Sequence, residues 1–239
     1  MEALTISASA ESSYEEMCAN TSLQRLPIFD NLTVYAKACF RNAFADCPNL
    51  YITTASNSTH SFATNASFAE SACEEMFYNS NITRTPANFE NIANLGVASF
   101  KGAFKNCTNI GNFELLLPEK KDIPTECFYE AFSGCTKFNC GTYGLRVLVN
   151  TVGDHGCYRM FYNCSSLVRL RSIIAFDSVN DNGMEEMFAE CTGLTTIASG
   201  LKSVTFLGIS AWQNMFYHCN SLANVPYITL NTTNGNSAL

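Results

Sequence analysis

The sequence repeats one short phrase eight times, and this repetition constrains the fold more than any other feature. Each copy has Ala or Met followed by a central residue, which is Phe in seven copies, and six copies have Cys three residues later. The central residues are Cys18, Phe44, Phe77, Phe104, Phe132, Phe161, Phe188 and Phe216. They follow one another at steps of 26, 33, 27, 28, 29, 27 and 28 residues. A regular period in this range predicts a solenoid, in which each unit buries its apolar side against its neighbours.

The residues before each central residue resemble a helix. Counting the central residue as position 0, position −4 is usually large or apolar, as in Tyr14, Phe100 and Trp212. Residues at −4 and 0 share one side of a helix. Four copies also have the spacing of a capping box between −6 and −3, at Ser12 and Glu15, Ser71 and Glu74, Asn182 and Glu185, and Ser210 and Gln213. These patterns predict that each unit begins with a short helix of about two turns.

The second half of each unit is typical of turns followed by a strand. Asn, Ser, Thr and Gly follow the Cys, and β-prone pieces such as LTTIAS, LVRLRSII, NFELLL and LRVLV come next. Stacking would place these pieces in a parallel sheet opposite the helices. We therefore predict one α/β repeat solenoid over residues 1–239, with about eight repeats of 26–33 residues between about 12 and 226. An N-terminal strand is expected within 1–11, and a C-terminal strand and tail within 227–239.

The repeated phrase resembles a known family. CYRMFYNCSSL (Cys157–Leu167) and CFRNAFADCPNL (Cys39–Leu50) are similar to the motif C-Y-x-x-M-F-x-G-C-T-S-L of the BspA-type leucine-rich repeats. Members of that family are surface proteins of bacteria and some protists, and similar repeats occur in proteins of gut bacteriophages. The resemblance implies a leucine-rich-repeat fold and a role in adhesion or protein recognition, without catalysis. The family's Pro-rich strand segments are mostly lost here, with Pro27, Pro86 and Pro226 as remnants.

The cysteines follow the repeat. Six of the twelve occupy position +3 and four lie at −4 or −5, which is not the pattern of a disulfide framework. We expect a ladder of buried free thiols that pack as small apolar side chains. Oxidation between neighbouring coils and zinc binding are the alternatives. The sequence has no C-x-x-C pair, and the step from Cys135 to Cys140 does not fit a zinc knuckle, so we expect no metal and no other cofactor.

Candidate catalytic groups are few. The histidines are His60, His155 and His218, and none lies in the pattern of a triad or metal site. Asp154 and His155 precede Cys157 and could form a nucleophile pair, but Cys157 occupies a repeat position that packing explains. We expect that the protein is not an enzyme.

Charge and terminal sequence limit the partners and the location. The net charge is −7, and Lys120 and Lys121 form the one basic pair, which argues against nucleic acid or an anionic membrane as the main partner. No apolar run approaches about 18 residues, so we expect no insertion into a membrane. The N-terminus MEALTISASAESS lacks the basic and apolar regions of a signal peptide. We expect a phage virion component (a fibre, decoration or tail protein), because virion proteins assemble in the cytosol. A bacterial surface adhesin and a cytoplasmic interaction scaffold are the alternatives.

Two kinds of surface could bind a partner. By analogy with leucine-rich repeats, outward strand positions fall near +8 and +10, at Asn112, Glu114, Arg169, Arg171, Thr196 and Asn224. Their polar mixture suits a protein partner or a host-surface glycan. The ends of the solenoid, with ALTISAS at one and YITLNTT at the other, lack a cap. We expect docking of these ends on a neighbouring protein or on another copy of the chain.

Overall fold

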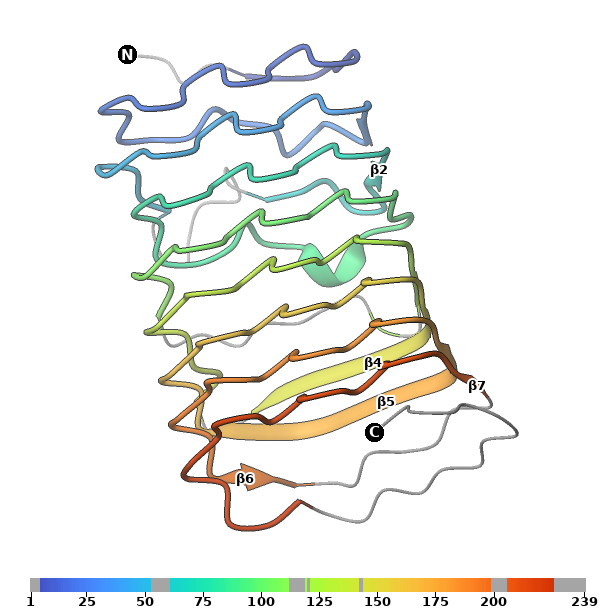
Figure 1. Ribbon diagram of the computed structural model, residues 1–239. Helices are drawn as coiled ribbons and strands as arrows, with labels where there is room; N and C mark the ends of the chain where they lie inside the picture. Colours follow the sequence, from blue (N-terminus) through green and yellow to red (C-terminus); the bar gives the residue numbers. More distant parts are fainter. Residues whose placement is uncertain are drawn as a thin grey trace.

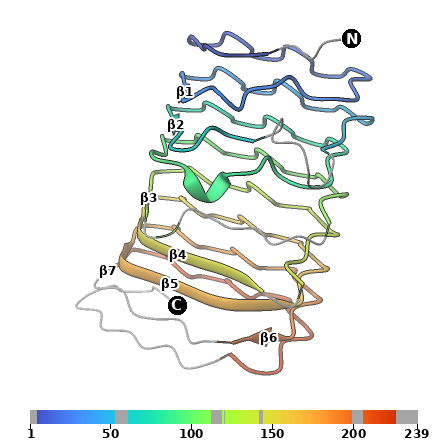
Figure 2. The same ribbon diagram turned by 180° about the vertical axis from the view of Figure 1, so that it is seen from behind.

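The computed structural model describes residues 5–52, 61–111, 119, 121–141, 144–198 and 206–225. These residues form a solenoid of coils stacked along one axis, where a coil is one circuit of the chain around the stack (Figure 1). Zigzag segments face the viewer in Figure 1, and β4 and β5 run across the side that faces the viewer in Figure 2. The prediction of a repeat solenoid is confirmed.

The strands form parallel sheets. Strand β1 (Val34–Tyr35) pairs with β2 (Ser67–Phe68), and a second sheet has the order β3-β4-β5-β6, with β7 also pairing with β5. Its strands are β3 (Lys121–Ile123), β4 (Leu145–Val152), β5 (Arg169–Val179), β6 (Thr196–Ile197) and β7 (Phe206–Leu207). Every pairing is parallel, as predicted. The pieces LRVLV, LVRLRSII and LTTIAS supply β4, β5 and β6, whereas NFELLL and YITLNTT lie wholly outside the described residues.

The predicted helices are wrong. The described residues contain no α-helix, and the one short helix is a 3₁₀ turn, η2 (Phe89–Asn91). Each segment expected to be helical is instead a run of consecutive turns from −6 to +2, which we call a turn run. Within it, backbone N–H groups alternate between two acceptors: Met17 N donates to Tyr14 O at 3.2 Å, and Cys18 N donates to Ala43 O of the next coil at 2.8 Å. The turn runs of successive coils therefore form a hydrogen-bonded ladder.

A left-handed residue at every fourth position makes the turn run possible. Positive φ recurs at −6, −2 and +2 of all eight turn runs, with Gly at two of the sites and non-Gly residues at the other 22. In the turn run of Phe104 these residues are Ala98 (φ 52°), Gly102 (φ 59°) and Asn106 (φ 61°). A period of four also places −4 and 0 together in the core, as a helix would. The segments expected to be capping boxes belong to these same turns. In one of them, Asn182 Nδ2 donates to Glu185 Oε2.

The core is a stack of side chains that runs along the solenoid. The central rings form an unbroken column from Phe44 to Phe216, with centroid separations of 4.9–5.9 Å between neighbours. A second buried column stands at −9, at the last residue of six strands, and is formed by Tyr35, Phe68, Ile123, Val152, Val179 and Leu207. Burying one such side chain stabilises the fold by about 1.5–3 kcal/mol. These two columns join the turn runs to the sheet.

Candidate recognition surface

The outer face of the sheet presents arginines from two adjacent strands. Leu145 of β4 and Leu170 of β5 are register partners, and both are fully buried. Side chains alternate between the two faces of a strand. Arg169 and Arg171, on either side of Leu170, are therefore exposed, and Arg146, next to Leu145, is half-buried. Arg169 also stands in register with the exposed Thr196 of β6.

A glycine lets the arginines approach the neighbouring coil. Gly144 precedes β4 and has φ +71°, a conformation that Gly adopts without strain. A Cβ at this position would lie 3.2 Å from Arg169 Cγ and 3.3 Å from the backbone N of Arg171. Arg146 Nη1 lies 3.0 Å from Glu119 Oε1. The Glu119 carboxylate thus pairs with the guanidinium group of Arg146 near the start of β4.

The structure places the predicted site residues in three groups. Arg169, Arg171 and Thr196 come together on the face just described, and Asn224 is exposed beyond the last turn run, outside any strand. Asn112 and Glu114 lie outside the described residues. Position +8 is not outward in every coil, since it is buried at Leu26, Ile52, Thr85 and Cys140. Arg146 was not among the predicted residues, although the alternation of apolar and polar residues at Leu145, Arg146 and Val147 was a signal for it.

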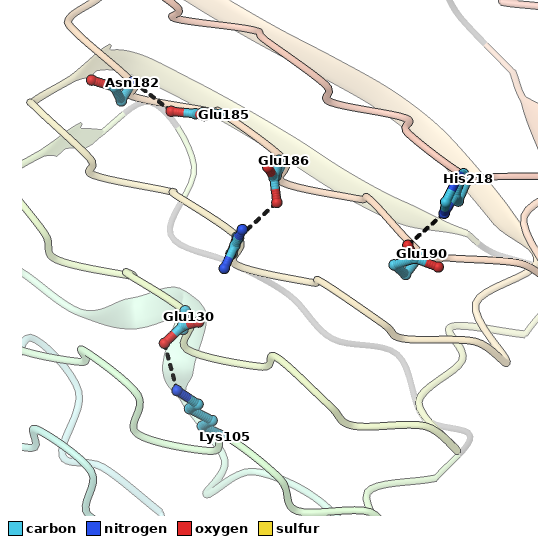
Figure 3. Close-up of polar contacts among 8 residues, drawn as sticks. Lys105, Glu130, Asn182, Glu185, Glu186, Glu190 and His218 are labelled. Carbon is cyan, nitrogen blue, oxygen red and sulfur yellow. Dashed lines mark hydrogen bonds and ion pairs between the residues drawn. The ribbon is translucent and has the colours of Figure 1, made fainter.

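The turn runs form a second polar surface, whose charges are paired between coils. Lys105 Nζ lies 2.6 Å from Glu130 Oε2, and His218 Nδ1 lies 2.7 Å from Glu190 Oε1 (Figure 3). Arg159 Nε is 2.7 Å from Glu186 Oε2, and this hydrogen bond raises the pKa of the guanidinium further. Partly exposed pairs of this kind add little stability. In the Lys105–Glu130 and Arg159–Glu186 pairs, opposite charges from neighbouring coils offset each other.

The candidate nucleophile does not fit its role. Cys157 is 1% exposed, and burial raises the pKa of its thiol well above the usual range. His155 lies with its ring 5.6 Å from that of Tyr158 and 6.3 Å from that of Tyr129. A reactive cysteine needs a lowered pKa and access to solvent. The structure therefore favours packing over catalysis for Cys157.

The other cysteines also match the packing prediction. All twelve are free thiols, and eleven of them are buried, with Cys18 half-buried. Within the described part of the chain, no group of three or more His, Cys, Asp and Glu side chains is arranged to hold a metal ion. Among the same residues, no helix has the length and apolarity needed to cross a bilayer.

Comparisons with known proteins give one distant structural likeness. No family model matches the sequence, and no curated protein matches it. The crystal structure of a leucine-rich repeat protein from Bacteroides ovatus is similar over 90% of this chain, at 13% sequence identity and a TM-score of 0.32. The chain spans 62% of the length of that protein.

Proposed function

We propose that the chain is a non-catalytic recognition module of the BspA type, built from eight leucine-rich-repeat-like units of 26–33 residues. In this proposal it binds a partner that carries negative charge through the outer face of β4, β5 and β6. The observation that carries the proposal is the placement of Arg146, Arg169 and Arg171 on that face, opposite the buried Leu145 and Leu170. The face also includes Thr196 as a neutral hydrogen-bonding neighbour.

The arginines stand out against the rest of the chain. The sequence has 14 Lys and Arg against 21 Asp and Glu, yet Arg146, Arg169 and Arg171 gather near the starts of β4 and β5. Guanidinium groups bind carboxylates and sulfate-like groups in two-pronged hydrogen bonds, which gives geometric specificity as well as attraction. An acidic segment of a protein is the partner that we favour. A sulfated or sialylated glycan would present similar groups.

The test is a binding measurement with charge-matched variants. The chain would be applied to arrays of acidic peptides, anionic glycans and neutral glycans at two salt concentrations. The double variant Arg169→Ala, Arg171→Ala should lose most of the binding to the best acidic probe. The control Arg25→Ala, Lys37→Ala removes the same charge from exposed sites far along the chain and should retain it. Equal binding by both double variants would contradict the proposal, and preference for an anionic glycan would change the partner class.

We further propose display of this module on a particle or cell surface, with a virion protein as the first candidate. Recognition of an external partner by a non-catalytic surface suits such a location. Quantitative peptide mass spectrometry on purified particles, washed cell surfaces and cytosol would test it. A fixed copy number on particles would support a virion component, and enrichment on cells would support an adhesin. Confinement to the soluble cytosol would contradict display and favour an interaction scaffold.

A further inference from the structure

The ladder of turn runs has a direction. Within each turn run, the backbone N–H groups at −6, −4, −2, 0 and +2 donate to the carbonyls at −7, −5, −3, −1 and +1 of the following coil. In the first pair of coils, Cys18 N donates to Ala43 O at 2.8 Å. In the last pair, Glu190 N donates to Tyr217 O at 2.8 Å. Every coil thus presents donors toward its C-terminal neighbour and acceptors toward its N-terminal neighbour.

The two terminal turn runs therefore end in complementary rows. Within the described ranges, no acceptor receives the N–H groups of the last turn run, which belong to Ser210, Trp212, Asn214, Phe216 and His218. Likewise, no described donor reaches the carbonyls at the acceptor positions −7, −5, −3, −1 and +1 of the first coil. These carbonyls belong to Glu11, Ser13, Glu15, Met17 and Ala19. The five donors at the C-terminal end and the five acceptors at the N-terminal end have the same spacing as the donors and acceptors that join the interior coils. Unpaired rows of this kind are templates for another chain.

We propose that a second copy of this chain docks head to tail, with the last turn run of one copy against the first turn run of the next. The interface would continue the ladder, so that Phe216 N of one copy donates to Met17 O of its neighbour, as Cys18 N does to Ala43 O. Because the two contacting surfaces differ, each added copy leaves a new free end, and the assembly grows as an open filament.

Position +3 supports this match independently of the backbone rows. In the interior coils, a thiol or hydroxyl at +3 donates to the central carbonyl of the preceding coil, as Ser80 Oγ does to Phe44 O at 2.6 Å. The first coil also has a hydroxyl at +3, on Thr21, but within the described chain it turns back to Cys18 O at 2.7 Å. A docked copy would supply Phe216 O at the place where the pattern requires an acceptor.

The charged side chains are compatible with the same docking. The last turn run, Ser210–His218, contains no acidic residue, whereas the first coil carries Glu11, Glu15 and Glu16. Between interior coils, Lys105 at +1 pairs with Glu130 at −2 of the next coil. Across the proposed interface, Tyr217 would stand at +1 and Glu16 at −2. No like-charged pair would be brought together, and such a pair would oppose association.

A disulfide trap tests the docking and its direction. Asn20 and His218 both occupy +2, and residues in one column of a ladder lie about 4.8 Å apart, within the range that a disulfide spans. An equal mixture of the Asn20→Cys and His218→Cys variants should give a disulfide-linked dimer on oxidation. Each variant alone and the wild-type chain measure the background from the native thiols. A mixture of Asn20→Cys with Gln213→Cys, which is in a different column, is the control for register and should give only background.

The mass of the assemblies that the wild-type chain forms in solution completes the test. Sedimentation over a concentration series should show species that grow by one chain at a time, and the double variant Asn20→Cys, His218→Cys should give a series of crosslinked oligomers. A strictly monomeric chain together with background crosslinking would overturn the proposal. So would efficient crosslinking of Asn20→Cys to itself, because it would place two N-terminal ends together.

Discussion

The thiol of Cys107 donates to the main-chain carbonyl of Phe77 in the preceding coil, with Sγ 2.9 Å from O. The same bond recurs at position +3, at 3.1–3.2 Å, for Cys47, Cys135, Cys164, Cys191 and Cys219. In the one interior coil without this cysteine, Ser80 makes the bond through its hydroxyl. From the second coil to the last, position +3 thus holds a small side chain that donates a hydrogen bond to the preceding coil.

Substitutions of Cys107 should reveal the contribution of this hydrogen bond. Cys107→Ser keeps a donor of nearly the same length, as Ser80 does, and should cost less than about 1 kcal/mol. Cys107→Ala removes the donor and leaves a small void, which should cost about 1–2 kcal/mol. The loss is moderate because Phe77 O still accepts the N–H of Ser80 at 3.1 Å. Urea unfolding measures both values, and a less stable Ser variant than Ala variant would contradict a donor role.

The buried thiols should make the protein sensitive to alkali. Burial raises the pKa of Cys107 and Cys127 to about 12, and the pKa of Cys39 and Cys219 to about 11. The thiols of the unfolded chain have a pKa of about 8.5. Above that pH, the unfolded chain therefore releases protons that the folded chain retains. Stability should be complete below about pH 8.5 and fall as pH rises toward 11, by up to about 1.4 kcal/mol per pH unit for each thiol.

The free energy of unfolding in urea, measured from neutral pH to about pH 10, tests this expectation. Cys107→Ser is the matched control, because a serine hydroxyl does not ionise in this range, and its stability should fall less steeply than that of the wild type. Equal slopes for the two proteins would contradict the proposed cause.

The sequence predicted the solenoid and the parallel sheet but not the turn runs. A two-turn helix and a run of turns with a period of four bury the same positions, −4 and 0, so the apolar pattern does not separate them. The distinguishing signal is the residue type at −6, −2 and +2, where Asn and Gly recur because they tolerate a left-handed backbone. They are Asn20, Asn42, Asn79, Gly102, Asn106, Gly134, Asn163, Asn182 and Asn214.

The face that carries Arg146, Arg169 and Arg171 was predictable only in part. Positions +8 and +10 are outward at Arg169 and Arg171 because β5 begins at Arg169, whereas β4 begins later in its coil, at Leu145. Strand starts differ from coil to coil, and the repeat phrase does not encode them. Leu145 pairs with Leu170 and Arg146 with Ser172, and the register shift between these two pairs leaves Arg171 as an extra residue between them. This pairing is a property of the folded sheet.

Substitutions at Asn42 separate a turn run from a helix. Asn42 is half-buried at position −2 and has φ 52°. At a left-handed site Gly has no steric penalty, so Asn42→Gly should be more stable than Asn42→Ala by about 1 kcal/mol. A helix would give the opposite order by a similar amount. Ala45→Gly, at a position in the same turn run that is not left-handed, is the control and should lose about 1 kcal/mol in urea unfolding.

The column of central rings should be most sensitive in its middle. Phe161 is stacked between Phe132, at 5.2 Å and 10°, and Phe188, at 5.5 Å and 2°, and it is fully buried. Phe161→Ala should cost about 3–5 kcal/mol, because it leaves a cavity between two coils. Phe161→Leu keeps most of the buried area but loses ring stacking, and should cost about 1–2 kcal/mol.

Phe216 supplies the matched control at the end of the column. Its ring is only partly buried and stacks on one neighbour, Phe188, at 5.9 Å and 9°. Phe216→Ala should therefore lower the free energy of unfolding by less than half as much as Phe161→Ala. Both are measured by urea unfolding at a dilution where the chains are separate. In a solenoid each coil contacts only its neighbours, so an interior gap weakens two interfaces and a terminal gap weakens one. Equal losses at the two sites would mean that the rings do not act as a column.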